Sequence, residues 1–305
     1  MKRSIEDAFE IARATDQDII RFHYWRLLLK PTRKIDEYTF LYGNPEREWH
    51  IRRFTPSSEL FNIVEEYPPK HRLPISIRFN QIEKYLSEME GWLENYSPRV
   101  EDFDEIRYLM ENYGKKYAIR VNGGNIGIGL TEDPVWLMAM IRQIRCFAKL
   151  GVKLLFGGGD FASNRGVCYP PKLFRELVLP RLRRITEECH KHGIYYLFGS
   201  DGNLWPVADD LSGRSRVDGY YEIDRRAGMD LRRLRKRFPR LILIGNISSY
   251  ALHFGAVEEV VLETLSCLRE AKSSRGIIVG VSNYVVPGTP KENITAMIET
   301  IRRNR

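Results

Sequence analysis

Two stretches decide the fold, Val152-Lys-Leu-Leu-Phe-Gly-Gly-Gly-Asp160 and Ile194-Tyr-Tyr-Leu-Phe-Gly-Ser-Asp201. Each is a short run of β-branched and aromatic residues that ends in glycine and aspartate, which is typical of a buried strand followed by a loop. From about Lys116 onward the same order of apolar run, polar cluster and amphipathic helix recurs, with further runs at 117–121, 217–221, 241–244 and 276–280. Strands that alternate with helices in this way predict a parallel sheet.

The helices between these runs begin with recognisable signals. Thr289-Pro-Lys-Glu292 combines a capping box with a proline in the first turn, and Pro170-Pro171 opens another helical pattern. An open sheet that binds a dinucleotide would carry Gly-x-Gly-x-x-Gly after its first strand, and Gly123-Gly-Asn-Ile-Gly-Ile-Gly129 does not have that spacing. We therefore predict an α/β fold of the closed kind, a (β/α)8 TIM barrel.

The first hundred residues have a different texture, with many aromatic and charged side chains, several prolines and few continuous apolar runs. They predict helices and long loops, with one strand near 38–42. The expected organisation is a single structural domain, in which residues 1–115 form an irregular, partly helical segment that contributes to the barrel and residues 116–305 form its main part. A chain of about 300 residues is long enough for one such barrel.

Composition excludes several classes of protein. The chain has 305 residues, a formal net charge of +8 and 43% hydrophobic residues, so it is neither disordered nor fibrous. Its four cysteines are far apart without a Cys-x-x-Cys pair, which indicates neither a disulfide framework nor a zinc ribbon. No signal peptide and no apolar run of membrane-spanning length is recognised, so we expect a cytoplasmic protein without membrane or nucleic-acid partners.

Polar residues follow the predicted strands, at the edge of a parallel α/β barrel where reacting groups lie. The catalytic candidates are three carboxyl groups, Asp160, Asp201 and Glu222, because a buried carboxyl group can act as a general acid or base. The substrate-binding candidates are Asn122, Asn203, Asn246, Ser282, Asn283 and Tyr284, and Asn125, Ser200 and Asp224 lie beside them in sequence. The alternative for each residue is that it caps a helix or forms a turn, which is the interpretation we favour for Asp224.

Two further patterns are interpreted as structural. Cys189-His190-Lys191-His192 has a cysteine and a histidine three residues apart, but it is expected on the solvent side of a helix end rather than at a metal. Leu231-Arg-Arg-Leu-Arg-Lys-Arg237 is typical of a helix with its leucines inward and its basic residues in solvent.

From about Tyr117 to its end, the chain resembles the uroporphyrinogen decarboxylase superfamily, which includes the cobalamin-dependent methyltransferases. The matching pieces are Gly159-Asp160-Phe-Ala with Gly166, Leu173-Phe-Arg-Glu-Leu-Val-Leu-Pro180, Asp201-Gly-Asn203, Ala227-Gly-Met-Asp230, Leu243-Ile-Gly-Asn246 and Pro287-Gly-Thr-Pro-Lys-Glu-Asn-Ile294. The resemblance implies a (β/α)8 barrel with its cleft at the carboxyl ends of the strands.

The chain departs from this family at the positions that carry its known chemistry. The methyltransferases bind zinc through His-x-Cys and a later Cys, and these places resemble Gly199-Ser-Asp201 and Asn283 here, so a zinc site of the usual type is not expected. If a metal binds at all, Asp201 and Glu222 are the candidate ligands. The decarboxylases carry an arginine-rich segment near the N-terminus and a late histidine, and neither is found in this sequence.

Three functions remain open. The first is methyl transfer to or from a corrinoid, with a corrinoid protein as partner, Asp160, Asp201 and Glu222 as positioning or proton-donating groups, and Asn246 and Asn283 orienting a small-molecule substrate. The second is decarboxylation of a porphyrinogen or another carboxylated molecule held by Arg52, Arg53 or Arg120. The third is a binding protein without catalysis on the same barrel. An oligomer of identical chains is left open.

Overall fold

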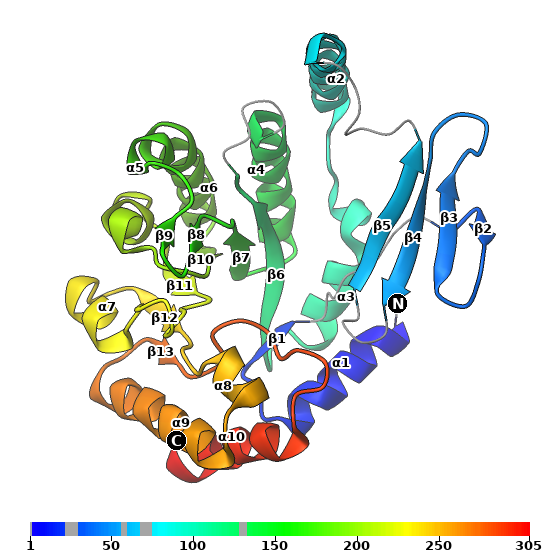
Figure 1. Ribbon diagram of the computed structural model, residues 1–305. Helices are drawn as coiled ribbons and strands as arrows, with labels where there is room; N and C mark the ends of the chain where they lie inside the picture. Colours follow the sequence, from blue (N-terminus) through cyan, green and yellow to red (C-terminus); the bar gives the residue numbers. More distant parts are fainter. Residues whose placement is uncertain (1, 22–29, 56–59, 68–74, 128–132) are drawn as a thin grey trace. The chain divides into compact units, whose positions relative to one another are not determined.

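The computed structural model describes residues 2–21, 30–55, 60–67, 75–127 and 133–305 (Figure 1). The chain divides into two compact units. Unit 1 comprises Met1–Phe22, Met89–Val285 and Thr289–Arg305, and unit 2 comprises His23–Glu88 and Val286–Gly288. In the part of the chain that is described, no helix is both long enough and apolar enough to cross a membrane.

Unit 1 contains a seven-stranded sheet in which every neighbouring pair is parallel, in the order β1-β6-β7-β10-β11-β12-β13. The strands are β1 (Ile19–Arg21), β6 (Ala118–Asn125), β7 (Leu154–Gly158), β10 (Tyr195–Gly199), β11 (Gly219–Tyr221), β12 (Ile242–Ile244) and β13 (Ile277–Ile278). Because the order in space follows the order in sequence, the carboxyl ends of successive strands lie beside one another. A small hairpin, β8 (Ala162–Ser163) and β9 (Gly166–Val167), follows β7.

Helices join successive strands, and Figure 1 shows α4, α6, α7 and α9 on the outer side of the curved sheet. The helices of unit 1 are α1 (Lys2–Ala14), α3 (Asp104–Asn112), α4 (Asp133–Lys149), α5 (Pro171–Leu173), α6 (Leu179–Lys191), α7 (Leu231–Arg237), α8 (Ser249–Phe254), α9 (Val257–Ser273) and α10 (Lys291–Asn304). 3-10 turns span Val100–Phe103 and Trp205–Val207, and π-helical turns span Phe174–Val178 and Asp210–Arg214. α2 (Ile75–Asn95) runs from unit 2 into unit 1.

Both faces of the sheet are buried, which explains why the strands are continuous apolar runs rather than alternating ones. Leu155, Tyr196 and Phe198 belong to the main core, which also contains the inward side chains of the helices. Phe156, Leu197 and Tyr221 form a second cluster, since successive side chains of a strand point to opposite faces. Gly199 ends β10 where a side chain would collide with the ring of Tyr221, so glycine is required there.

The prediction of an α/β fold with a parallel sheet is confirmed, and the six predicted strands are β6, β7, β10, β11, β12 and β13. β1 is an additional strand that pairs with β6. Within the described residues no ladder joins β1 to β13, so closure into an eight-stranded barrel stays a prediction.

Unit 2 contains a four-stranded antiparallel sheet in the order β2-β3-β4-β5. Its strands are β2 (Arg33–Lys34), β3 (Thr39–Gly43), β4 (Trp49–Thr55) and β5 (Leu60–Tyr67). The strand predicted near 38–42 is confirmed as β3 and predicted helices are found as α1 and α2, whereas β2, β4 and β5 were not predicted. β4 is only half-buried along its length and mixes aromatic with basic residues, so it lacks the apolar run by which strands were recognised.

The unit boundaries also differ from the expected division at 115/116, because residues 89–115 belong to unit 1. The single structural domain stays a prediction.

Candidate functional site

Three carboxyl groups lie at the carboxyl edge of the parallel sheet in unit 1. Asp160 lies two residues after the end of β7, Asp201 two residues after the end of β10, and Glu222 directly after β11. These three strands are neighbours in the sheet. The negative charge of Asp160 raises the pKa of Asp201, and the charges of Asp160 and Asp201 raise the pKa of Glu222. The structure therefore brings together the three residues predicted to be catalytic.

Asp201 has an environment that favours its protonated form. Burial is the largest cause of its raised pKa, and the negative charges of Asp160 and Asp224 raise it further. Asn283, which follows β13, donates a hydrogen bond from Nδ2 to Asp201 Oδ2 over 3.1 Å and opposes the shift. Asp201 is thus a half-buried carboxyl group that keeps its proton to a higher pH than an ordinary aspartate and is held by one amide.

Ser200 fixes the backbone that carries Asp201. Its side chain is buried, its Oγ accepts a hydrogen bond from the Phe161 amide over 3.3 Å and donates one to the Asp201 carbonyl over 3.4 Å. Tyr220 reaches the same turn, since its hydroxyl donates to the Ser200 carbonyl over 3.0 Å. Burial raises the pKa of Tyr220, so this hydroxyl remains a donor.

Glu222 is the second carboxyl group with a raised pKa. Burial is the largest cause, and the nearby arginines Arg120 and Arg21 oppose it. The residue has a left-handed backbone with φ 65°, which directs the chain away from β11 immediately after the strand ends.

Arg120 and Arg21 lie at paired positions of the adjacent parallel strands β6 and β1. The guanidinium of Arg120 lies over the rings of Phe156 and Tyr221, at 4.3 and 4.9 Å from the ring centres. Its Nη2 also donates to the Tyr221 hydroxyl over 3.4 Å. The site therefore contains guanidinium groups beside its acids.

The hydroxyl of Tyr221 lies between the guanidinium of Arg120 and the backbone of β7. This hydroxyl donates to the Gly157 carbonyl over 2.7 Å, and burial raises its pKa to about 12. Sequence reasoning missed Tyr220, Tyr221 and Arg21. The tyrosines were assigned to a strand without a role, and the run Ile19-Ile-Arg21 was too short to be recognised as a strand.

Most of the amides predicted to bind substrate form turns and caps instead of facing Asp201. Asn122 accepts from the Gly124 amide over 3.0 Å, and Asn203 accepts from the Trp205 amide over 3.2 Å. Asn246 is buried and donates from Nδ2 to the Met229 carbonyl over 2.9 Å. Asn283 is the predicted amide that the structure brings to an acid, and the substrate contacts of the other three stay predictions.

The remaining strand-end residues are placed as follows. Ser282 is buried and accepts from the Ser249 amide over 3.2 Å. Tyr284 is 61% exposed. Asp224 accepts from the amides of Arg226 and Ala227, which confirms that it forms a turn, although its charge also acts on Asp201.

The donor groups of the described residues do not fit a metal ion. Among these residues no three His, Cys, Asp or Glu side chains converge in the way a metal requires. The expected solvent position of Cys189 is wrong, because its side chain is fully buried in the core. His190 instead pairs through Nε2 with the carboxylate of Asp218, at 3.0 and 3.1 Å.

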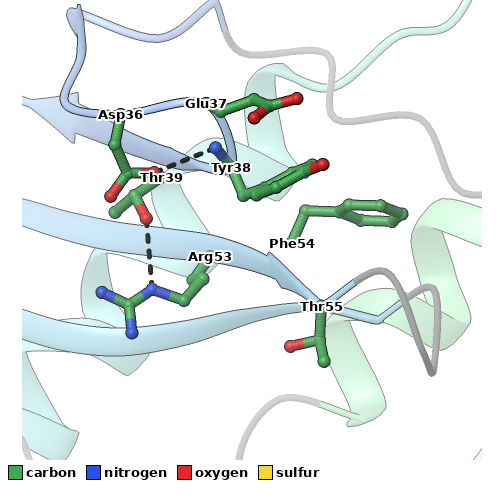
Figure 2. Close-up of a pocket in the computed structure, with 7 residues that line it drawn as sticks. All are labelled: Asp36, Glu37, Tyr38, Thr39, Arg53, Phe54 and Thr55. Carbon is green, nitrogen blue, oxygen red and sulfur yellow. Dashed lines mark hydrogen bonds between the residues drawn. The ribbon is translucent and has the colours of Figure 1, made fainter.

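Unit 2 has a recess of about 420 Å³ of its own (Figure 2). It lies along the hairpin between β2 and β3 and the end of β4, and contains Asp36, whose pKa is lowered by the backbone hydrogen bond from Tyr38. Arg53 donates from Nε to Thr39 Oγ1 over 3.1 Å. Asp36 is a solvent-exposed hydrogen-bond acceptor, so this recess offers no proton donor comparable to Asp201.

A family model and a curated relative both point to one family. The model of the family described as Uroporphyrinogen decarboxylase (URO-D) matches residues 137–304, which is more than half of the chain. A curated uroporphyrinogen decarboxylase from Anaeromyxobacter sp. (strain Fw109-5) is 30% identical over 129 residues, covering 41% of this chain and 35% of that protein. The chain thus spans about a third of the length of this relative.

Two solved structures are similar over about two thirds of the chain. A methyltransferase from Methanosarcina mazei is 19% identical, with a TM-score of 0.49 over 65% of this chain and 62% of that chain. A D-tagatose 3-epimerase-like protein is 12% identical, with a TM-score of 0.42 over 66% of this chain and 82% of that chain.

Proposed function

The chain belongs to the uroporphyrinogen decarboxylase family, and from that premise we propose that it is an enzyme that removes a one-carbon group from a small molecule, with Asp201 as general acid. The observation that carries the proposal is the environment of Asp201, a half-buried carboxyl group with a raised pKa at the strand-end edge. A carboxyl group of this kind donates a proton to the atom that loses its bond in the transition state. Asn283 holds the carboxyl group in position.

The first form of this proposal is methyl transfer or demethylation. Asp201 donates its proton to the oxygen or nitrogen that the methyl group leaves, so the departing group is neutral. A corrinoid is the second substrate, carried by a partner protein, and supplies the cobalt that accepts the methyl group. Asp160 helps to keep the proton on Asp201, because its negative charge raises the pKa of Asp201, and Asp160 and Asp201 together raise the pKa of Glu222.

Zinc has no part in the proposal. The methyltransferases that the sequence resembles use zinc to activate a thiol, and the described residues contain no group of donors that fits it. Donors with a methoxy or methylamine group, whose leaving oxygen or nitrogen a proton can activate, are therefore the expected substrates.

The test is a methyl-transfer assay with free cob(I)alamin and a panel of methoxylated and methylated donors. Turnover by the wild-type protein and a loss of about 100-fold or more in kcat for Asp201→Asn are expected, which is the usual contribution of a general acid. Asp209→Asn is the matched control, because Asp209 is exposed and paired with Arg237 outside the site. Absence of turnover with every donor contradicts methyl transfer.

A second form, decarboxylation, is favoured by the arginines beside Glu222. Arg120 and Arg21 lie at paired positions, and guanidinium groups bind a substrate carboxylate well. The departing carboxylate then leaves as carbon dioxide with its bonding electrons left on carbon, and Asp201 protonates that carbon. Incubation with a porphyrinogen and chromatography of the products tests this form, with a raised KM expected for Arg120→Gln.

The two assays also address the third possibility. If neither reaction occurs while substrate analogues bind saturably, the result favours a binding protein without catalysis. Equal activity of Asp201→Asn and wild type in whichever reaction occurs would remove Asp201 from the mechanism.

A further inference from the structure

The helices α7 and α9, which lie on the outer side of the sheet in Figure 1, contribute lining residues to a cavity of unit 1. It has a volume of about 290 Å³, and charged side chains dominate its lining. Three arginines, Arg225, Arg232 and Arg269, face it together with Asp230 and Glu270. None of the three acids at the strand ends lines this cavity, and Asn246 is the one predicted substrate-binding residue that does.

The two acids of the cavity are already engaged. Glu270 accepts a hydrogen bond from Arg232 Nε over 3.1 Å. Asp230 is the N-cap of α7 and accepts from the Arg233 amide over 2.7 Å. These pairings leave Arg225 and Arg269 as the guanidinium groups of the cavity without a carboxylate partner in the part of the chain that the structure describes.

Arg225 is partly buried, and its partners are all neutral. Its Nε donates to the Asn246 carbonyl, and its Nη2 lies 3.3 Å from Asn246 Oδ1, 3.5 Å from Ser266 Oγ and 3.4 Å from Cys267 Sγ. Its Nη1 has no hydrogen-bond acceptor among the described residues. A partly buried charge is normally paired, so a guanidinium with free donors that faces a cavity favours an anion as its ligand.

Arg269 supplies a second cation on the same cavity. Its side chain is exposed on α9 and has no ion pair within the described ranges. Three guanidinium groups against two carboxylates leave the lining with a net charge of +1, which favours an anion such as a phosphate group. The planar fork of arginine also matches the oxygens of a phosphate group.

From this arrangement we propose that this cavity binds a phosphate group, with Arg225 and Arg269 as its ligands. The volume of 290 Å³ exceeds that of a few water molecules, so there is room for a small organic group on the phosphate. The ligand is therefore free phosphate or a small phosphate monoester. The site lies on the same β11–α7 connection as Glu222 and Asp224, but the proposal does not depend on the reaction assigned to Asp201.

The test is isothermal titration calorimetry of the full chain with inorganic phosphate, glycerol 3-phosphate and citrate at constant ionic strength. Saturable binding at one site per chain is expected for a phosphate probe. Tighter binding of glycerol 3-phosphate assigns a phosphate monoester, and tighter binding of inorganic phosphate assigns the free ion. No saturable binding of either probe, or tighter binding of citrate than of both, would overturn the proposal.

Variants show where the phosphate binds. Arg225→Gln is expected to weaken binding about tenfold or more, because it removes a charge-assisted hydrogen bond from a partly buried site. Arg269→Gln is expected to weaken it several-fold, and because this side chain is exposed, it provides the test if Arg225→Gln does not fold. Arg183→Gln, on α6 and outside the cavity lining, is the control. Unchanged binding by the Arg269 variant contradicts the assignment, and Asp201→Asn is expected to bind phosphate as the wild type does.

Discussion

At the scale of the residue, the chemistry of this molecule depends on which carboxyl groups are buried without a cation. Asp201 has an amide partner and two neighbouring carboxylates, whereas Asp209 has a direct bond from Arg237. The pKa of Asp201 is raised by burial, and the pKa of Asp209 is lowered by its arginine. The same residue type in one chain thus keeps its proton to a higher pH than an ordinary aspartate at one position and loses it at a lower pH at the other.

This contrast predicts opposite effects of pH on folding stability. The folded protein binds the Asp201 proton at pH values where the unfolded chain has released it, so the stability linked to Asp201 is complete below the ordinary pKa of 3.8 and falls as pH rises through the folded pKa. Asp201→Asn removes this dependence. The stability of the variant relative to wild type is therefore expected to increase as pH rises above 3.8.

Urea unfolding of both proteins at a series of pH values measures the difference. Asp209→Asn is the control of opposite sign, because a lowered pKa adds stability above 3.8 that is lost as pH falls through the folded pKa. Its stability relative to wild type is expected to be lowest near neutral pH. A difference for Asp201→Asn that does not change with pH would show that its pKa is not raised.

At the scale of the element, one buried carboxylate joins the two π-helical turns of unit 1. Asp210 lies in the second turn, and its Oδ2 accepts from Arg175 Nε in the first turn over 2.8 Å. Its Oδ1 accepts from Arg214 Nη1 in its own turn over 3.1 Å. π-helical turns have poorer backbone geometry than α-helices, so this bridge stabilises segments that would otherwise relax.

Removing the bridge is expected to destabilise unit 1. Asp210→Ala loses two charge-assisted hydrogen bonds, and because both arginines are at least half-exposed the expected cost is about 2 kcal/mol. Asp209→Ala, one residue away, removes an ion pair in which both side chains are more than half-exposed, at 53% and 57%, and is expected to cost about 1 kcal/mol or less. Urea unfolding distinguishes the two, and equal costs would contradict a structural role for the bridge.

At the scale of the whole molecule, the strands that could be predicted from the sequence are those buried on both faces, because burial on both faces produces a continuous apolar run. The runs of β7 and β10 are buried on both faces, and so their strands and the acids after them, Asp160 and Asp201, were found. β4 was missed because half-buried strands carry polar residues, and β1 because three residues make no pattern. The side chain of Asn246 could not be placed, because its partner Met229 comes from another loop, a contact that spacing along the chain does not encode.

The same contrast between the two units predicts their resistance to opening. β7 and β10 have fully buried side chains on both faces, whereas β5 of unit 2 exposes Ile63, Val64 and Tyr67 at 45%, 54% and 54%. Backbone amides exchange with solvent through the least costly opening that exposes them, and segments with little buried apolar surface open most readily. In hydrogen exchange followed by mass spectrometry, peptides from β4 and β5 are expected to exchange faster than peptides from β7 and β10.

The Asp210→Ala variant tests whether unit 1 and unit 2 open independently. If amides of β10 exchange only when unit 1 unfolds, a loss of about 2 kcal/mol accelerates them about 30-fold. The amides of β4 and β5 exchange through opening of the unit 2 sheet, which contains neither Asp210 nor its arginines, so their rates are expected to stay unchanged. Equal acceleration of both sets of peptides would show that the two units open together, because a single cooperative unfolding event transmits the same free-energy loss to every amide that depends on it.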